Sequence, residues 1–146
     1  MKITVEESGK NNGEVEVLIK CGRRNEKIEK LISAIQLNSQ TIIGKSEGKT
    51  YFIPLEEILY IDTVDEKVFL YTNEKVYETD LRLYEIEVIT GDTPVMRVNK
   101  STILNLMKVD HVEPMLNGKI KAILFNRETI IISRLYVHSF KRKLGI

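Results

Sequence analysis

The side chains best suited to chemistry in this sequence are the lysines and arginines of its last third. They fall mostly at the expected ends of strands, in turns or in the C-terminal tail. Nine of them are Arg97, Lys100, Lys119, Lys121, Arg127, Arg134, Lys141, Arg142 and Lys143. Functional side chains often lie on loops because a rigid scaffold holds the loops in position. Cationic side chains held at one end of a β-sheet body suit contacts with DNA phosphates and with the edges of guanine bases.

The net charge of the chain conceals an uneven distribution. The total over 146 residues is only +1. Residues 1–40 carry 7 basic and 6 acidic side chains, residues 41–95 carry 5 and 12, and residues 96–146 carry 10 and 3. The middle of the chain is therefore acidic and the last third is basic. Such asymmetry indicates either a face that binds a polyanion or a folded dipole with solvated faces.

Residues typical of enzymes and metal sites are few. His111 and His138 lie in unrelated segments, and the alternation of a strand predicts that Asp110 points away from His111. The single cysteine, Cys21, leaves no intramolecular disulfide or cysteine-based zinc site. The scattered glycines form no phosphate-binding loop. We therefore expect no catalytic residue, no metal, no cofactor and no small-molecule substrate.

The first forty residues predict a small β-β-α unit. Alternating apolar side chains favour strands over 1–7 and 14–21, joined by a polar turn. Asn25 is suited to cap a helix over 25–36, and residues 37–40 are expected to form a linker. One apolar stripe follows the helical repeat, at Ile28, Leu31, Ile32 and Ile35.

From residue 41 the pattern changes to short strands separated by turns. We expect strands over 41–45, 49–53, 57–62, 67–72, 75–79, 121–125 and 128–133. Asn117-Gly118 predicts a tight hairpin, because a two-residue turn of this type needs positive φ at both residues. A short helix capped by Asp80 is expected over 80–90, and residues 134–146 form a helix or a frayed end. Evenly spaced strands predict a mainly β chain with a sandwich or barrel-like body.

Four segments carry a resemblance to a known family. They are IPLEEILYIDTVDEKVFLYT (53–72), YETDLRLYEIE (77–87), MRVNKSTILNL (96–106) and IIISRLYVHSFKRKLG (130–145). The most specific piece is Arg97-x-x-Lys100-Ser101-x-x-x-Asn105, followed by the pair Ser133-Arg134. In this order, over residues 41–146, they resemble the LytTR family of bacterial DNA-binding domains.

The resemblance implies an elongated, antiparallel, β-sandwich-like body with one short helix, whose loops enter successive major grooves of double-stranded DNA. By motif position, the main candidate DNA contacts are Lys67, Lys100 and Arg134. The secondary candidates are Asn99, Ser101, Lys141 and Arg142, with Lys143 beside them. The family often has a histidine at the position of Lys67, and a histidine followed by arginine or asparagine at 99–100. These departures leave the base preference open.

Structural roles stay open for some of the same residues. Lys67 is also suited to keep a hairpin end soluble, and Arg134 to guard an apolar strand against aggregation. Ser101 is also suited to bond the backbone of a turn, and this is the role that we expect for Asn105.

The expected organisation is an N-terminal extension over 1–40 and a DNA-binding domain over 41–146. The extension is too short for the receiver domain of most family members, so we expect a stand-alone transcription regulator. Its apolar stripe forms a homodimer, docks a partner such as a membrane protein, or packs on the chain's own β body. The competing function is a non-enzymatic protein-interaction module. With no signal peptide and no apolar run near ~18 residues, the expected location is the cytoplasm.

Overall fold

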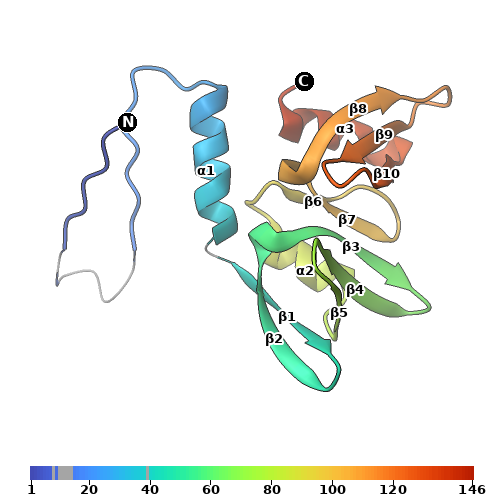
Figure 1. Ribbon diagram of the computed structural model, residues 1–146. Helices are drawn as coiled ribbons and strands as arrows, with labels where there is room; N and C mark the ends of the chain where they lie inside the picture. Colours follow the sequence, from blue (N-terminus) through green and yellow to red (C-terminus); the bar gives the residue numbers. More distant parts are fainter. Residues whose placement is uncertain (8, 10–14, 39) are drawn as a thin grey trace.

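The computed structural model describes residues 1–7, 9, 15–38 and 40–146, and these form three α-helices and two sheets (Figure 1). The helices are α1 (Glu26–Asn38), α2 (Leu83–Thr90) and α3 (Arg134–Leu144). Strands of the larger sheet are β1 (Thr41–Ser46), β2 (Lys49–Pro54), β3 (Ile58–Val64), β4 (Lys67–Thr72), β5 (Val76–Thr79), β6 (Val95–Arg97) and β7 (Thr102–Asn105). The smaller sheet has β8 (Val109–Pro114), β9 (Ile120–Leu124) and β10 (Thr129–Ile132). Two 3-10 turns, Leu55–Glu57 and Leu106–Lys108, lead into β3 and β8.

All pairings of strands in the two sheets are antiparallel, so the prediction of a mainly β, antiparallel fold is confirmed. The larger sheet has the order β2-β1-β5-β4-β3-β7-β6, and the smaller one has β10-β9-β8. The body nevertheless contains two α-helices, α2 and α3, where the family resemblance implied one. The second forms because its apolar side chains have a core to fill.

Two hairpins of the larger sheet close with two-residue turns in which both residues have positive φ. The angles are 51° at Glu47 and 74° at Gly48 between β1 and β2, and 51° at Asp65 and 65° at Glu66 between β3 and β4. Turns of this kind match the twist of the flanking strands. Glycine adopts the angle at no steric cost, whereas the three acidic residues do not. The turns predicted around 46–48 and 63–66 are confirmed.

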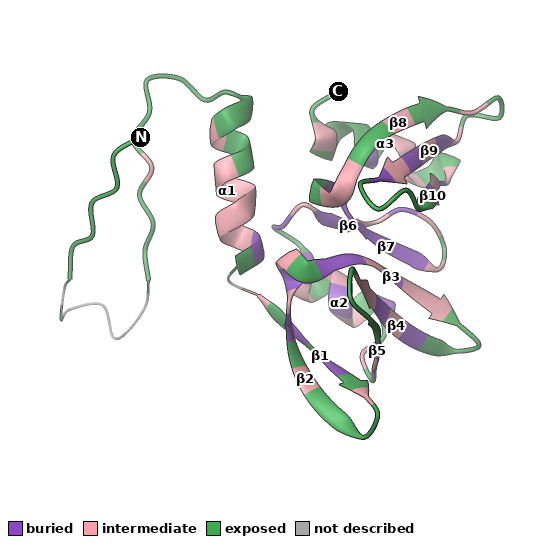
Figure 2. Ribbon diagram, in the orientation of Figure 1, coloured by how far each residue is buried: buried purple, intermediate pink, exposed green. Residues whose placement is uncertain are grey.

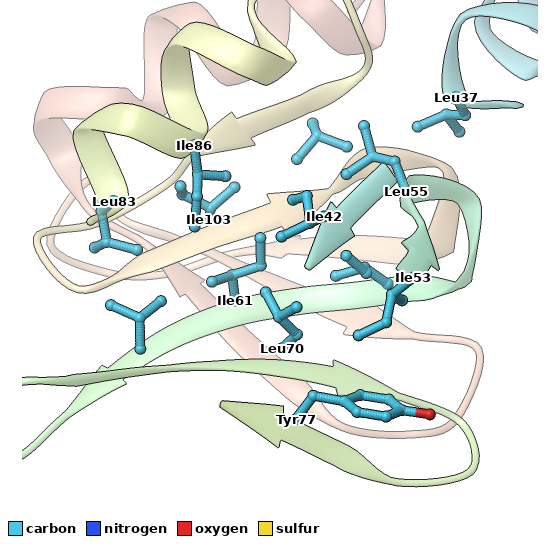
Figure 3. Packing of buried hydrophobic residues seen from close by; sticks show 13 residues of the cluster. Leu37, Ile42, Ile53, Leu55, Ile61, Leu70, Tyr77, Leu83, Ile86 and Ile103 are labelled. Atoms are coloured by element: carbon cyan, nitrogen blue, oxygen red, sulfur yellow. The ribbon is translucent and has the colours of Figure 1, made fainter. Parts of the chain in front are cut away.

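The first core lies between one face of the larger sheet and α2 (Figure 3). The strands and the first 3-10 turn contribute Ile42, Ile53, Leu55, Ile58, Ile61, Leu70 and Ile103, among others. From α2 come Leu83 and Ile86, which sit at i and i+3 on one face of the helix. This packing fixes α2 against the sheet and so fixes the start of β6.

The second core lies between the smaller sheet, α3 and the β3–β7 part of the larger sheet. It contains Leu59, Val98, Leu104, Leu106, Ile120, Ala122, Leu124, Ile130, Ile132 and Phe140. In β7, Ile103 belongs to the first core and its neighbour Leu104 to the second, because successive side chains point to opposite faces. β7, like β3 with Ile61 and Leu59, therefore contributes to both cores, and the loop before it starts from a fixed base.

The predicted pair of N-terminal strands is wrong for the part of residues 1–21 that the structure describes. Residues 1–7 and 15–21 contain no strand, and Figure 2 shows this segment almost wholly exposed. The predicted turn between them lies mostly outside the described residues. Ile3, Val15 and Leu18 keep at least three-quarters of their surface exposed. An alternating pattern makes a strand only when one face is buried and fixes the register, and no such face is present here.

The predicted helix is confirmed, with a later end. α1 starts after Asn25, whose Oδ1 accepts a hydrogen bond from the backbone N–H of Ile28 at 3.1 Å. The expected linker over 37–40 is wrong at its start, because Leu37 and Asn38 continue the helix. Leu37 is buried in the first core, which couples the end of α1 to the β body.

The start of the second helix also differs from the prediction. α2 begins at Leu83, after Arg82, and the backbone N–H of Arg82 donates to Oε1 of Glu85 at 3.1 Å. Asp80 does not cap this helix, because its carboxylate accepts a hydrogen bond from Nζ of Lys45 in β1.

The hairpin around Asn117-Gly118 exists, but its turn is longer than predicted. Of the two residues only Gly118 has positive φ, at 77°. The backbone N–H of Met115 donates to the carbonyl of Lys119 at 3.0 Å and closes a wider loop. At the C-terminus the open alternative is decided in favour of a helix, since α3 runs to Leu144 and ends on Gly145 with a left-handed φ of 78°.

Candidate nucleic-acid interface

Three connections that carry the main candidate side chains gather on the side of the molecule away from α1 (Figure 1). They are the turn at 65–66 between β3 and β4, the loop 98–101 between β6 and β7, and the junction at 133 between β10 and α3. Each follows or precedes a strand whose side chains fill a core. The cores therefore determine where these connections emerge.

The loop 98–101 is organised by its own side chains. Oδ1 of Asn99 accepts a hydrogen bond from the backbone N–H of Ser101 at 2.9 Å and another from its Oγ at 3.3 Å. Nδ2 of Asn99 donates to the carbonyl of Ile131 in β10 at 2.9 Å. The structure thus places these two secondary candidates in internal contacts. The structural role expected for Asn105 is confirmed, since its buried amide donates to Ile58 and accepts from Met107.

The same loop is bonded to β3, which leads into the turn at 65–66, and to the junction at 133. On one side the backbone N–H of Thr63 donates to the carbonyl of Ser101 at 3.0 Å, and Oγ1 of Thr102 donates to Asp62 at 3.0 Å. On the other side the backbone N–H of Ser133 donates to the carbonyl of Val98 at 2.9 Å. The loop is therefore the middle member of the three, with β3 and the start of α3 as its flanks.

Arg97 supports the loop from the end of β6. Its Nε donates to the carbonyl of Asn99 at 3.3 Å, and its Nη2 donates to the carbonyl of Lys100. Its Nη1 lies 3.3 Å from Oε2 of Glu87 in α2. The sequence analysis placed Arg97 among the basic residues suited to DNA contacts, and at the start of the most specific motif, but not among the candidate contacts. The signal in the sequence is that Arg97 stands only two and three residues before Asn99 and Lys100, whose carbonyls accept its hydrogen bonds.

Lys67 and Lys100 have exposed side chains. Lys67 is the first residue of β4 and pairs with Val64 at the end of the β3–β4 hairpin. Among the described residues neither ammonium group has a hydrogen-bond or ion-pair partner. Both cations are therefore available to an external anion or to the edge of a base.

Arg134 is the first residue of α3 and is exposed. Its stem lies over the β8–β9 loop, because a Cβ added to Gly118 would stand 3.2 Å from Cδ of Arg134. Gly118 thus leaves room for the Arg134 side chain. Lys119, which follows Gly118 in the sequence, lies in the same region. Lys119 stood among the basic residues of the sequence but not among the candidate contacts.

The basic tail is not brought to the same place. Lys141 and Arg142 are exposed in the last turn of α3, about 10 Å along the helix axis from Arg134. Nζ of Lys143 donates to the carbonyl of Thr93 at 2.8 Å, and burial lowers the pKa of this lysine. Lys143 therefore holds the end of α3 against the turn after α2.

The base of the β3–β4 hairpin is also attached to the smaller sheet. Tyr60 and Tyr71 stack with ring centroids 4.4 Å apart and ring planes 12° from parallel. Burial raises the pKa of Tyr60, and the neighbouring carboxylate of Glu128 raises it further. Burial raises the pKa of Tyr71 as well. Both phenols stay neutral at physiological pH, and Tyr60 packs against the second core with Tyr71 stacked on it.

The arrangement around His111 differs from the prediction. A register shift between Val109 and His111 turns the carboxylate of Asp110 toward the ring, and Oδ2 lies 2.8 Å from Nδ1 of His111. Within the described ranges no group of three or more histidine, cysteine, aspartate or glutamate side chains is arranged to hold a metal ion. No helix among the described residues is long and apolar enough to cross a membrane.

Comparison with known proteins gives consistent matches. The LytTr DNA-binding domain model matches residues 48–145. The sensory transduction protein LytT of Enterococcus faecalis is 29% identical over 108 residues, which are 74% of this chain but only 45% of that protein. An uncharacterized HTH-type transcriptional regulator of Staphylococcus aureus is 25% identical over 138 residues, 93% of each chain.

A solved structure shows the same fold. It is the LytTr DNA-binding domain of a Bacillus cereus protein described as a methyl-accepting/DNA response regulator, with a TM-score of 0.68 and 20% identity. The alignment covers 73% of this chain and 97% of that domain. Together with the family model, which matches well over half of the sequence, these findings establish that the chain belongs to the LytTr DNA-binding domain family.

Proposed function

We propose that this chain is a transcription regulator that reads a specific sequence in double-stranded DNA through loops placed in the major groove. The observation that carries the proposal is the set of exposed cations Lys67, Lys100 and Arg134 on three connections, of which the loop 98–101 is hydrogen-bonded to β3 on one side and to the start of α3 on the other. The membership of the family and the regulators among its relatives support it.

The chemistry of the three side chains suits the two tasks of a DNA reader. Lysine and arginine contact phosphates in any sequence, and such contacts set position and general affinity. An arginine or lysine that reaches O6 and N7 of guanine supplies specificity. Lys100 and Arg134 stand on the connections that are most firmly bonded to the body, so we assign base reading to them and a phosphate contact to Lys67.

Selection from randomised DNA duplexes, followed by equilibrium binding of the full chain, tests the proposal. We expect Lys100→Ala and Arg134→Ala each to weaken binding to the selected duplex by about 10- to 100-fold and to relax one base preference. Lys67→Ala is expected to weaken binding to all duplexes alike and to reduce the salt dependence by about one charge.

The matched control is Lys49→Ala, an exposed lysine in the β1–β2 hairpin. If Lys100→Ala and Arg134→Ala bind as Lys49→Ala does, reading by these loops is wrong. A selection that returns no consensus contradicts sequence specificity itself.

We also propose that residues 1–38 join two copies of the chain. Ile3, Val5, Val15 and Leu18 are each at least 75% exposed, and the stripe of α1 is only half-buried. Exposed apolar side chains in such number mark a contact surface. In sedimentation of the full chain we expect a dimer. Replacement of these four residues by serine should give a monomer, while Val88→Ser, an exposed control on α2, should not. A monomeric mass for the full chain, equal to that of the four-serine variant, would refute the dimer.

A further inference from the structure

We propose that Asn99 does not touch DNA but is a positioning residue, which sets the distance and orientation between Lys100 and Arg134. This inference rests on the proposed function, since it concerns how the same reading surface is built. Asn99 was a secondary candidate for a DNA contact, beside the main candidate Lys100. The position of its amide indicates a different role.

Both polar atoms of the Asn99 side chain are used inside the protein. Oδ1 accepts from the backbone N–H of Ser101 at 2.9 Å, and Nδ2 donates to the carbonyl of Ile131 at 2.9 Å. One partner is a donor and the other an acceptor, so the hydrogen-bond partners themselves fix which end of the amide is which. The side chain is half-buried, and a base would have to displace these contacts to reach it.

The two contacts connect the two side chains that we assign to base reading. Ser101 follows Lys100 in the loop, and Ile131 lies in β10 three residues before Arg134. The backbone bond from Ser133 to Val98 runs between the same two segments at 2.9 Å. Two hydrogen bonds therefore join the loop to the segment from β10 to α3: one comes from the Asn99 side chain, and the other is between backbone groups.

The chemistry of the link requires an amide. Aspartate keeps an oxygen that accepts from Ser101, but it has no N–H for the carbonyl of Ile131 and places a negative charge beside that oxygen. Alanine removes both bonds and leaves the loop held by its backbone and by Arg97. The two substitutions therefore separate the local turn from the link to β10.

Equilibrium binding of the full chain to its selected duplex tests the inference through a double-mutant cycle. We expect Asn99→Ala to weaken binding by about tenfold, with Asn99→Asp at least as severe. In the Asn99→Ala background, Lys100→Ala should cost much less than in the native chain, because its side chain is already misplaced. Fully additive losses, with relaxed preference at a base of its own, would show instead that Asn99 contacts DNA.

A second measurement needs no DNA. Amide hydrogen exchange of the folded variants should rise at Ser101 in Asn99→Ala, while β7 and α2 keep their protection, and Asn73→Ala in the β4–β5 turn serves as the control. Unchanged exchange at Ser101 would overturn the positioning role. If DNA binding is insensitive to Lys100→Ala while the exchange result is as expected, the reading surface is wrong and the link is right.

Discussion

The loop 98–101 and the turn of the β3–β4 hairpin present their lysines on the same side of the molecule but are built in opposite ways. The loop is held by hydrogen bonds to β3, to β10, to the start of α3 and to Arg97. The turn at Asp65 and Glu66 is held by its own two strands, with the last pair at Val64 and Lys67. A braced loop suits the base reading that we propose for it, whereas a projecting turn is suited to electrostatic contact.

The two connections also differ in charge and in backbone strain. Asp65 and Glu66 precede Lys67 and oppose the approach of a phosphate, while the described residues of the loop carry one cation and no acidic group. Both turn residues have positive φ without being glycine, a conformation that costs each of them about 1 kcal/mol. We therefore expect the acidic turn to weaken binding to DNA of arbitrary sequence, so a net charge of +1 is compatible with the proposed sequence-specific binding.

The largest expected effect concerns the packing that presents Arg134. Phe140 is fully buried in the second core and anchors α3. We expect Phe140→Ala to lower the free energy of unfolding by about 3–5 kcal/mol in urea denaturation. Leu135→Ala on the exposed face of the same helix should change it by about 0.5 kcal/mol or less. A small effect of Phe140→Ala would mean that the braced side of the comparison does not depend on this core.

An intermediate effect is expected at the bond between the loop and the hairpin. Thr102 is 5% exposed, and its Oγ1 donates to Oδ1 of Asp62 at 3.0 Å. Thr102→Val keeps the shape but removes the donor, so the free energy of unfolding should fall by about 1–3 kcal/mol. Thermal denaturation measures the change, and Thr50→Val, at an exposed position in β2, is the control. If both variants melt alike, the two connections are less firmly joined than the geometry indicates.

The smallest expected effect sharpens the account of the turn. Glu66→Gly removes the backbone strain at φ 65°, and we expect it to stabilise the chain by about 0.5–1 kcal/mol. It also removes a negative charge beside Lys67, so binding to a duplex without the selected sequence should tighten by a few fold at low salt. Glu57→Gln is the control for charge away from the turn. A loss of stability in Glu66→Gly would show that the side chain, and not the strain, dominates here.

Much of the body followed from local patterns. The hairpins of β1–β2 and β3–β4, the strands β9 and β10, and α1 were predictable because alternation, helical spacing and turn residues act over a few neighbours. The prediction of N-terminal strands is wrong because alternation alone does not form a strand: this segment has no face that is buried against a core. The prediction that Asp80 caps α2 is wrong because its carboxylate accepts a hydrogen bond from Lys45, which is distant in sequence.

The candidate site was predictable in part. The motif drew attention to the segment from Arg97 to Asn105 and to Ser133-Arg134, and the structure bonds these segments to one another. It did not reveal that the Asn99 side chain and the Ser101 carbonyl make hydrogen bonds inside the protein, since the carbonyl of Ile131 and the N–H of Thr63 come from other strands. Nor did it show that Lys141 and Arg142 lie at the far end of a helix, because the tail had two open interpretations.

The sequence by itself determined the chemistry available to this protein: which side chains are cationic, where the acidic turn stands and where alternation favours a strand. These properties depend on residue type and on neighbours along the chain. The tertiary structure alone decided which polar residues remain free for a ligand and which are used internally. A hydrogen bond between segments forms only when the two cores bring their backbones within about 3 Å, and that distance is set by packing across the whole body.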